Sequence, residues 1–129
     1  LLMRVLLDTH AFLWFVSGNS KLSRSARLII ENPGNELLLS AASIWELGIK
    51  SSLGRITFPC PLDQYVAEKI KAGFVVLSIT WKHAATVANL PLEHRDPFDR
   101  MLVAQAICEK ISIITRDTKI ANYGVNTIW

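Results

Sequence analysis

MRVLLDTHAFLWFV, residues 3–16, is the stretch of sequence that indicates the fold class. Residues 3–7 form a short apolar run typical of a buried strand, and the run ends at the polar Asp8. Residues 9–16 then place large apolar side chains at helical spacing. We therefore expect a strand followed directly by a helix, with Asp8 at the junction between them.

The same alternation continues along the chain, with turn-forming residues between the segments. The sequence predicts further strands at residues 36–39, 74–77, 111–115 and 125–129, and further helices at residues 23–31, 40–52, 61–72, 80–90 and 96–110. Because strands alternate with helices throughout, we expect an α/β fold with a central, mainly parallel sheet of four to five strands, covered on both faces. No linker or repeat divides the chain, so a single domain is expected over residues 1–129.

Composition and charge exclude several classes of protein. Half of the 129 residues are hydrophobic, which excludes a disordered chain. Polar residues interrupt every apolar run well before the roughly 20 residues of a membrane span, and no secretory cleavage site follows the first residues. We therefore expect no membrane association and a cytoplasmic location, in which Cys60 and Cys108 are reduced structural thiols.

Four acidic residues stand where an apolar run gives way to a helix start or a polar turn: Asp8, Glu46, Asp99 and Asp117. In an open parallel sheet, the carboxyl ends of the strands and the starts of the following helices form one edge, so such residues can converge. Several carboxylates held together repel one another, and a divalent cation with oxygen ligands removes that repulsion. The sequence predicts a shared acidic site that binds a divalent cation.

Each of these residues also has a purely structural interpretation. Asp8 is a good helix N-cap. Glu46 follows Ser43 at the spacing of a capping box, although a helix that starts at Ser40 would instead place Glu46 in its second turn. Taken singly, these positions do not decide between the two interpretations.

The same ambiguity holds in the second half of the chain. Asp96 is the better cap for the helix that begins at Pro97, which leaves Asp99 as the better candidate ligand. Asp117 could simply form a turn, and we interpret Thr115 as a hydrogen-bond donor to the acidic cluster. The functional interpretation gains its weight from all four carboxylates occupying positions at one edge.

Basic residues lie close in sequence to these carboxylates and could contact a phosphate backbone. The candidates for binding a nucleic-acid backbone are Lys50, Arg55, Arg95, Arg100, Arg116 and Lys119. For any one of them, an ordinary solvated side chain is the alternative. The net charge of +3 does not by itself indicate a nucleic-acid-binding protein.

Other chemistries find no support in the sequence. There is no glycine-rich phosphate loop, no His-Glu-x-x-His zinc motif and no Cys-x-x-Cys pair. The His94-Arg95-Asp96 triplet resembles a kinase catalytic loop, but the asparagine that such a loop requires is missing, so no site role is assigned to His94. The large aromatic side chains, Trp45 and Trp81 among them, are expected mostly in the core.

Four segments together resemble one known family: LLDTHAFLW at 6–14, SIWELGIK at 43–50, HRDPFDRMLVAQA at 94–106 and ITRD at 114–117. They resemble the PIN domain, and specifically the small VapC-type toxins of bacterial type II toxin–antitoxin systems. The resemblance implies a three-layer α/β/α fold and a metal-dependent endoribonuclease under the control of a protein antitoxin. It also implies a homodimer.

The resemblance carries catalytic and metal-binding roles onto four positions of this sequence, Asp8, Glu46, Asp99 and Asp117. Thr115 matches a frequent hydroxyl position of the family, and Asp96 is either a cap alone or an acid that acts through water. We expect one or two Mg²⁺ or Mn²⁺ ions to activate a water molecule for attack on an RNA phosphodiester.

Two other functions remain open at this point. One is a receiver-like signalling module, although a receiver has an adjacent acidic pair after its first strand and Asp8 is followed by Thr9. The other is a PIN-like scaffold that binds RNA without cutting it.

Overall fold

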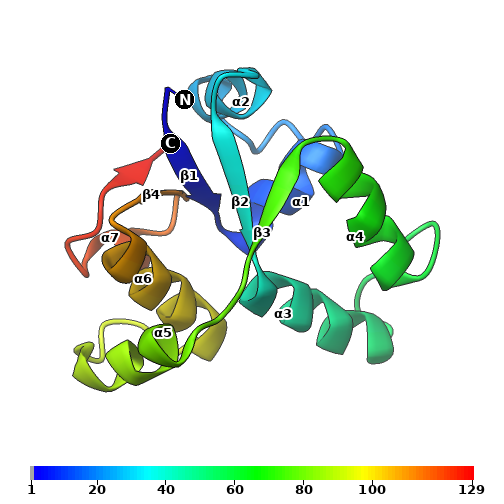
Figure 1. Ribbon diagram of the computed structural model, residues 1–129. Coiled ribbons are helices and arrows are strands. Elements are labelled where there is room, and N and C mark those ends of the chain that lie inside the picture. The colour runs from blue at the N-terminus through cyan, green and yellow to red at the C-terminus, as the bar shows by residue number, and fades with distance from the viewer. Residues whose placement is uncertain (1) are drawn as a thin grey trace.

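The sheet has five strands in the order β3-β2-β1-β4-β5, and every pairing between them is parallel (Figure 1). These features come from a computed structural model that describes residues 2–129. The strands are β1 (Arg4–Leu7), β2 (Glu36–Ser40), β3 (Phe74–Leu77), β4 (Ser112–Ile114) and β5 (Thr127–Ile128). The parallel α/β architecture predicted from the sequence is confirmed.

The helices lie between the strands along the chain. They are α1 (Thr9–Val16), α2 (Arg24–Glu31), α3 (Ala41–Ser52), α4 (Leu62–Lys71), α5 (Trp81–Thr86), the short 3-10 helix η1 (Val87–Asn89), α6 (Pro97–Glu109) and α7 (Thr118–Ala121). Ser23, Ser40, Thr80 and Asp96 each accept a hydrogen bond from a backbone amide of the first turn. Gly73, with a φ of +118°, makes the turn from α4 into β3.

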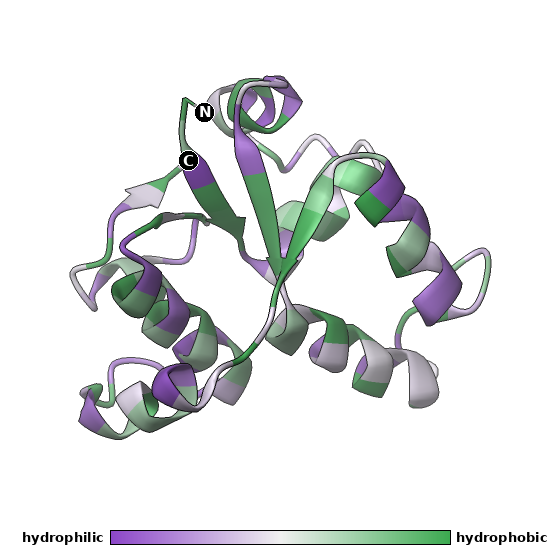
Figure 2. Cartoon of the chain, in the orientation of Figure 1, coloured by the Kyte–Doolittle hydropathy of each residue, from purple (hydrophilic) through white to green (hydrophobic). Residues whose placement is uncertain are grey.

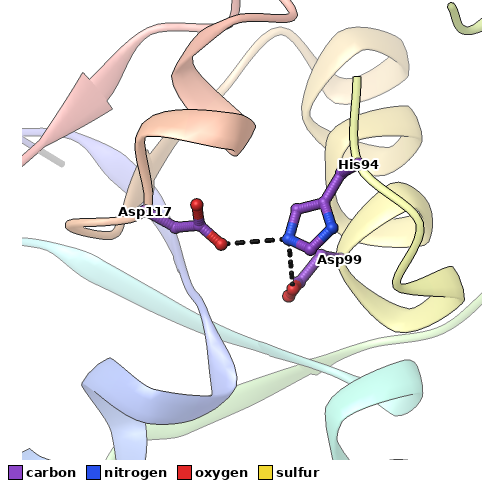
Figure 3. A group of neighbouring side chains, drawn as sticks. All are labelled: His94, Asp99 and Asp117. Atoms are coloured by element: carbon purple, nitrogen blue, oxygen red, sulfur yellow. Dashed lines mark hydrogen bonds and ion pairs between the residues drawn. The ribbon is translucent and has the colours of Figure 1, made fainter. Parts of the chain in front are cut away.

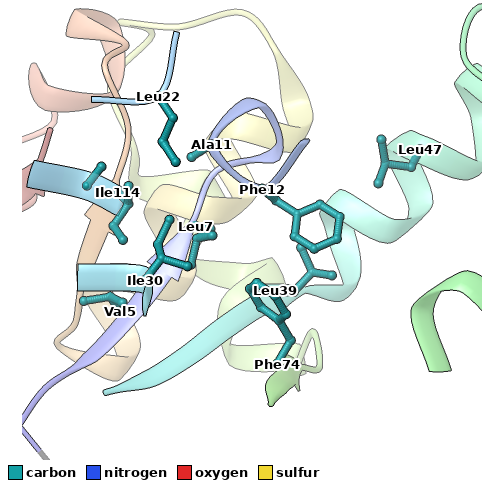
Figure 4. Close-up of a cluster of buried hydrophobic side chains, with 11 residues drawn as sticks. Val5, Leu7, Ala11, Phe12, Leu22, Ile30, Leu39, Leu47, Phe74 and Ile114 are labelled. Carbon is teal, nitrogen blue, oxygen red and sulfur yellow. The ribbon is translucent and has the colours of Figure 1, made fainter. Parts of the chain in front are cut away.

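Side chains of β1 alternate between the two faces of the sheet, as a strand requires. Val5 and Leu7 face a core that includes Phe12 of α1 and Ile30 of α2 (Figure 4). Phe12 meets Phe74 of β3 edge to face, with 5.3 Å between the ring centroids. This first face is therefore covered by α1, α2 and α4.

Leu6 of β1 faces the opposite core, against α6 and α7. Gln105 of α6 is fully buried there, and its side-chain oxygen accepts a 2.6 Å hydrogen bond from the Ser40 hydroxyl at the end of β2. Apolar residues follow the charged residue that begins each of β1 and β2, whereas the helices carry polar residues on parts of their surface (Figure 2). Helices thus cover both faces of the sheet, which confirms the three-layer arrangement.

Two aromatic side chains that we expected in the core lie at the surface. Trp45 is 63% exposed and Trp81 is 79% exposed, so the expectation that they lie in the core was wrong. Trp45 lies on α3 one residue before a buried position, and a helix turns adjacent side chains about 100° apart.

Within residues 2–129, no helix has the combination of length and apolar character needed to cross a membrane, and α6, the longest, has 13 residues.

The sheet order creates a specific location for a binding site. From β1 the chain first builds outward through β2 to β3, and later continues on the other side with β4 and β5. The crevice between the carboxyl ends of β1 and β4 is the point where the order reverses, which is where ligands bind in open α/β sheets. Asp8 directly follows β1, and Asp117 follows β4 after two residues.

Candidate active site

Asp8 combines a capping role with a place in the crevice. Its Oδ1 accepts a 2.7 Å hydrogen bond from the Ala11 amide, so it is the N-cap of α1. The Thr115 hydroxyl also hydrogen-bonds this carboxylate. The residue is only 6% exposed, and burial raises the pKa of its carboxyl above the ordinary value of 3.8. The two interpretations of Asp8 are therefore compatible.

Glu46 lies in the second turn of α3, because Ser40 and not Ser43 caps that helix. The capping-box interpretation of Glu46 was wrong. Its Oε1 lies 2.9 Å from the Thr9 hydroxyl, which is also 2.9 Å from the Ser43 hydroxyl. Since a hydroxyl has one proton, Thr9 donates to the carboxylate and accepts from Ser43. The first helix and α3 are thus joined at this edge through Glu46.

Asp96 and Asp99 have different roles at the start of α6. Asp96 is the cap, and its Oδ1 accepts from the amides of Phe98 at 2.8 Å and of Asp99 at 3.2 Å. The Asp99 carboxylate is left to face the crevice. Burial first, and then repulsion from Asp96, raise the pKa of Asp99 from 3.8 to about 7, against the opposing effect of His94. Asp8 and Glu46 contribute further repulsion.

Asp117 is the N-cap of α7, and its Oδ1 accepts a 2.9 Å hydrogen bond from the Lys119 amide. The Thr115 hydroxyl oxygen accepts from the Asp117 amide at 3.0 Å, which fixes the turn after β4. The other oxygen, Oδ2, points into the crevice. Thr115 therefore touches both Asp8 and the backbone of Asp117.

His94 joins Asp99 and Asp117, and the sequence reasoning assigned it no role. Its Nε2 lies 3.0 Å from Asp99 Oδ2 and 3.0 Å from Asp117 Oδ2 (Figure 3). Because His94 Nδ1 accepts a hydrogen bond from the Asp96 amide at 3.2 Å, the ring carries its proton on Nε2 and donates it to the two carboxylates. A sequence signal did exist, since His94 belongs to the same motif as Asp99.

The four carboxylates converge to different degrees. Asp99 and Asp117, with His94, offer ligand atoms that all lie within 4.8 Å of one another. Asp8 and Glu46 are not part of this group of three, but they stand close enough to raise the pKa of Asp99 electrostatically. The assignment of these side chains to metal binding and catalysis stays a prediction.

Two of the predicted RNA-binding cations are bonded to other groups of the protein. Lys50 pairs with Glu46, with 2.9 Å between Nζ and Oε2. Arg100 donates to the carbonyl of Pro91 at 2.9 Å and to the Tyr123 hydroxyl at 3.0 Å, so its guanidinium stabilises the loop before α6. These contacts give Lys50 and Arg100 structural roles that the sequence reasoning did not foresee. The remaining candidates, Arg55, Arg95, Arg116 and Lys119, are exposed.

The donor set fits a divalent cation. Carboxylate oxygens are hard ligands of the kind that Mg²⁺ and Mn²⁺ prefer. The raised pKa of Asp99 shows that negative charge at this edge is unfavourable without a positive partner. Asp99, Asp117 and Asp8 are the residues that would hold such an ion, with Glu46 reaching it directly or through water.

Comparison with known proteins agrees with this geometry. A family model described as the PIN domain matches residues 5–126. The chain belongs to the PIN domain family. This PIN domain is 32% identical over 123 residues to Ribonuclease VapC22 of Mycobacterium tuberculosis, covering 92% of the chain and 91% of the relative. Ribonuclease VapC16 of the same organism is 38% identical over 60 residues, 46% of this chain and 43% of the relative.

Solved structures share the fold at low sequence identity. VapBC2 from Rickettsia felis, bound to a DNA fragment from its promoter, superposes with a TM-score of 0.71 at 16% identity and covers 98% of each chain. VapBC-1 from nontypeable Haemophilus influenzae superposes with a TM-score of 0.68 at 19% identity, covering 98% of this chain and 97% of the other. The family predicted from the sequence motifs is confirmed.

Proposed function

We propose that this PIN domain is a metal-dependent endoribonuclease that hydrolyses RNA phosphodiester bonds and acts as the toxin of a toxin–antitoxin pair. The observation that carries the proposal is the meeting of Asp99 and Asp117 at the crevice between β1 and β4, with Asp8 and Glu46 beside them. The similarity to proteins named ribonucleases supports the choice of RNA as substrate.

Mg²⁺ or Mn²⁺, as one or two ions, is the proposed cofactor. These carboxylates would hold the divalent cation, which when bound would activate a water molecule for attack on phosphorus and offset the charge on the phosphate oxygens. No side chain has to form a covalent bond to the substrate in such a reaction.

The protein's own contribution is to hold the carboxylates in place before substrate arrives. Thr115 fixes Asp8, and Thr9 fixes Glu46. Lys50 offsets part of the negative charge at Glu46. The Nε2–H of His94 points at Asp99 and Asp117. If the His94 ring turns away from these carboxylates, the same N–H can donate a hydrogen bond to a phosphate oxygen of the substrate.

Protein partners belong to the same proposal. The chain also shares its fold with a structure described as a toxin–antitoxin complex from Klebsiella pneumoniae, at a TM-score of 0.63 and 19% identity, which supports a cognate antitoxin for this chain. A groove of apolar residues between α3, α5 and α6 contains Trp45 and Phe98 in edge-to-face contact at 5.3 Å. Exposed apolar surface of this kind supports a protein-binding role, and we propose a homodimer. Action on RNA and the two unpaired cysteines support a cytoplasmic location.

The receiver-like alternative does not fit the sheet. Receivers have the strand order 2-1-3-4-5, whereas this sheet has the order 3-2-1-4-5. The alternative that still requires a test is a PIN domain that binds RNA without cutting it.

The test is to incubate the purified chain with end-labelled RNA in Mn²⁺ or Mg²⁺ buffer, and again with excess EDTA. We expect the wild-type chain to cleave the RNA and EDTA to abolish that cleavage. The Asp99→Asn variant should not cleave the RNA, although circular dichroism should show that it is folded. Binding without cleavage in either metal would support the scaffold, and cleavage by folded Asp99→Asn at the wild-type rate would refute the assignment of the site.

A further inference from the structure

A cavity of about 560 Å³ opens beside the acidic cluster, and its walls carry opposite charges. Asp8 and Asp117 contribute acidic groups to its lining. The lining also contains His10, Trp14, Lys21 and Arg116, and we call this hollow the Trp14 cavity. Of these four residues, the sequence reasoning named only Arg116 as a contact for RNA.

The basic side chains of the cavity lie against the Trp14 ring. The Arg116 guanidinium carbon lies 4.5 Å from the ring centroid, and Lys21 Nζ lies 5.9 Å from it. Both are within the range of cation–π attraction. The His10 ring stacks on the same indole at 5.5 Å, with 24° between the planes. Trp14 therefore positions two cations and an imidazole around one point.

These cations are not neutralised by the protein. Among residues 2–129, no carboxylate oxygen lies within 4.0 Å of a side-chain nitrogen of Lys21 or Arg116. Lys50 is different, because it is already paired with Glu46. Cations that are ordered by an aromatic ring but lack an anionic partner are available to an anion that enters the cavity.

The position of the cavity indicates which anion fits. Arg116 and Asp117 are consecutive residues, so an anion at Arg116 lies next to a group held at Asp117. A carboxylate cluster repels the RNA backbone, and cations alongside it are needed to hold the strand. Because His10, Arg116 and Lys21 already surround the indole, the cavity is better suited to a phosphate than to a stacked base.

We propose that the Trp14 cavity binds the phosphate of the nucleotide adjacent to the cleaved bond of single-stranded RNA, through Arg116 and Lys21, with Trp14 as the residue that positions them. This inference rests on the proposed nuclease function and adds a substrate subsite to it. The ligand is a phosphodiester, recognised by charge and not by base identity.

The test is equilibrium binding of a fluorescein-labelled 12-nucleotide uridine RNA, measured by fluorescence anisotropy in EDTA between 50 and 200 mM KCl. Every protein carries Asp99→Asn so that the RNA stays intact. The test protein adds Lys21→Ala and Arg116→Ala. The matched control instead adds Lys71→Ala and Lys82→Ala, which remove the same charge from exposed positions outside the cavity.

Each phosphate contact contributes about 0.7 to the slope of log affinity against log salt for a single strand, so we expect the test protein to lose about 1.4 from the slope. The control should keep the slope of its parent. An Arg116→Lys variant retains the charge and should lose less of the slope than Arg116→Ala. Equal losses in the test and control proteins, or no measurable binding by the Asp99→Asn parent at 50 mM KCl, would overturn the subsite.

Cleavage separates this proposal from the one on which it rests. With Asp99 intact and Mn²⁺ present, the loss caused by Lys21→Ala with Arg116→Ala should appear mainly as a higher KM. If the wild-type chain fails to cut RNA, the nuclease proposal fails. If the wild-type chain cuts RNA and the cavity variant matches it in both KM and salt slope, only the subsite fails.

Discussion

Asp99→Asn should make the protein more stable in EDTA at neutral and alkaline pH while removing its nuclease activity. The reason is that the native fold holds the Asp99 carboxyl where its charge is unfavourable. Burial and the neighbouring Asp96 raise its pKa from 3.8 to about 7. At about 1.36 kcal/mol per pKa unit, this shift corresponds to at most about 4 kcal/mol. Because 20% of the side chain is still exposed to water, we expect about 2 to 4 kcal/mol.

The pH dependence has a definite sign. Below the unfolded pKa of 3.8, Asp99 is protonated in both states and the substitution changes little. Between 3.8 and about 7 the unfolded chain loses this proton while the native state retains it, so the wild-type stability falls relative to the variant as pH rises. Above about pH 7 both states are ionised, and the variant keeps its full advantage.

The assay is urea denaturation at several pH values from 4 to 8, in EDTA, followed by tryptophan fluorescence. Asp63→Asn, the same change in the exposed first turn of α4, is the matched control and should cost less than about 1 kcal/mol at every pH. The reasoning is refuted if Asp99→Asn has no higher free energy of unfolding than wild type at pH 8. It is also refuted if the difference between them is the same at pH 4 and pH 8.

Three further predictions concern residues whose contacts only the structure revealed. His94→Ala should lower the free energy of unfolding in EDTA by about 1 to 3 kcal/mol, because Asp99 and Asp117 lose a shared donor; unchanged urea denaturation would contradict the bridge. Arg100→Ala should cost about 2 kcal/mol through its lost hydrogen bonds to the Pro91 carbonyl and the Tyr123 hydroxyl, whereas Arg95→Ala, an exposed neighbour, should stay within about 0.5 kcal/mol. Trp45→Glu should convert the proposed homodimer to a monomer in light scattering after size exclusion, and a wild-type monomer at high concentration would contradict the dimer itself.

The sequence predicted those parts of the fold that local chemistry decides. Apolar runs marked the strands, and side chains that can cap a helix marked the helix starts, as at Ser40 and Asp96. The position of Glu46 could not be decided, because Ser40 and Ser43 are equally good caps in sequence and only packing selects Ser40.

Contacts between distant segments explain what the sequence could not provide. His94 looked unimportant because its two acceptors are contributed by α6 and by the turn after β4, 23 residues away in the case of Asp117. Arg100 looked like a free cation because most of its partners are backbone carbonyls, which carry no signature in the sequence, and the other is the distant Tyr123 hydroxyl. Trp45 looked like a core residue because composition does not reveal which side of a helix is left uncovered.

The two carboxylate oxygens of Asp117 have separate roles, because Oδ1 caps α7 and Oδ2 contacts His94. Replacing it with alanine removes both oxygens at once, and an inactive enzyme could then reflect a frayed helix as easily as lost chemistry. Asparagine keeps one acceptor for the helix and offers an uncharged amide to the crevice. For side chains that belong to the scaffold and the reaction together, the amide is the informative replacement, and truncation confuses the two causes.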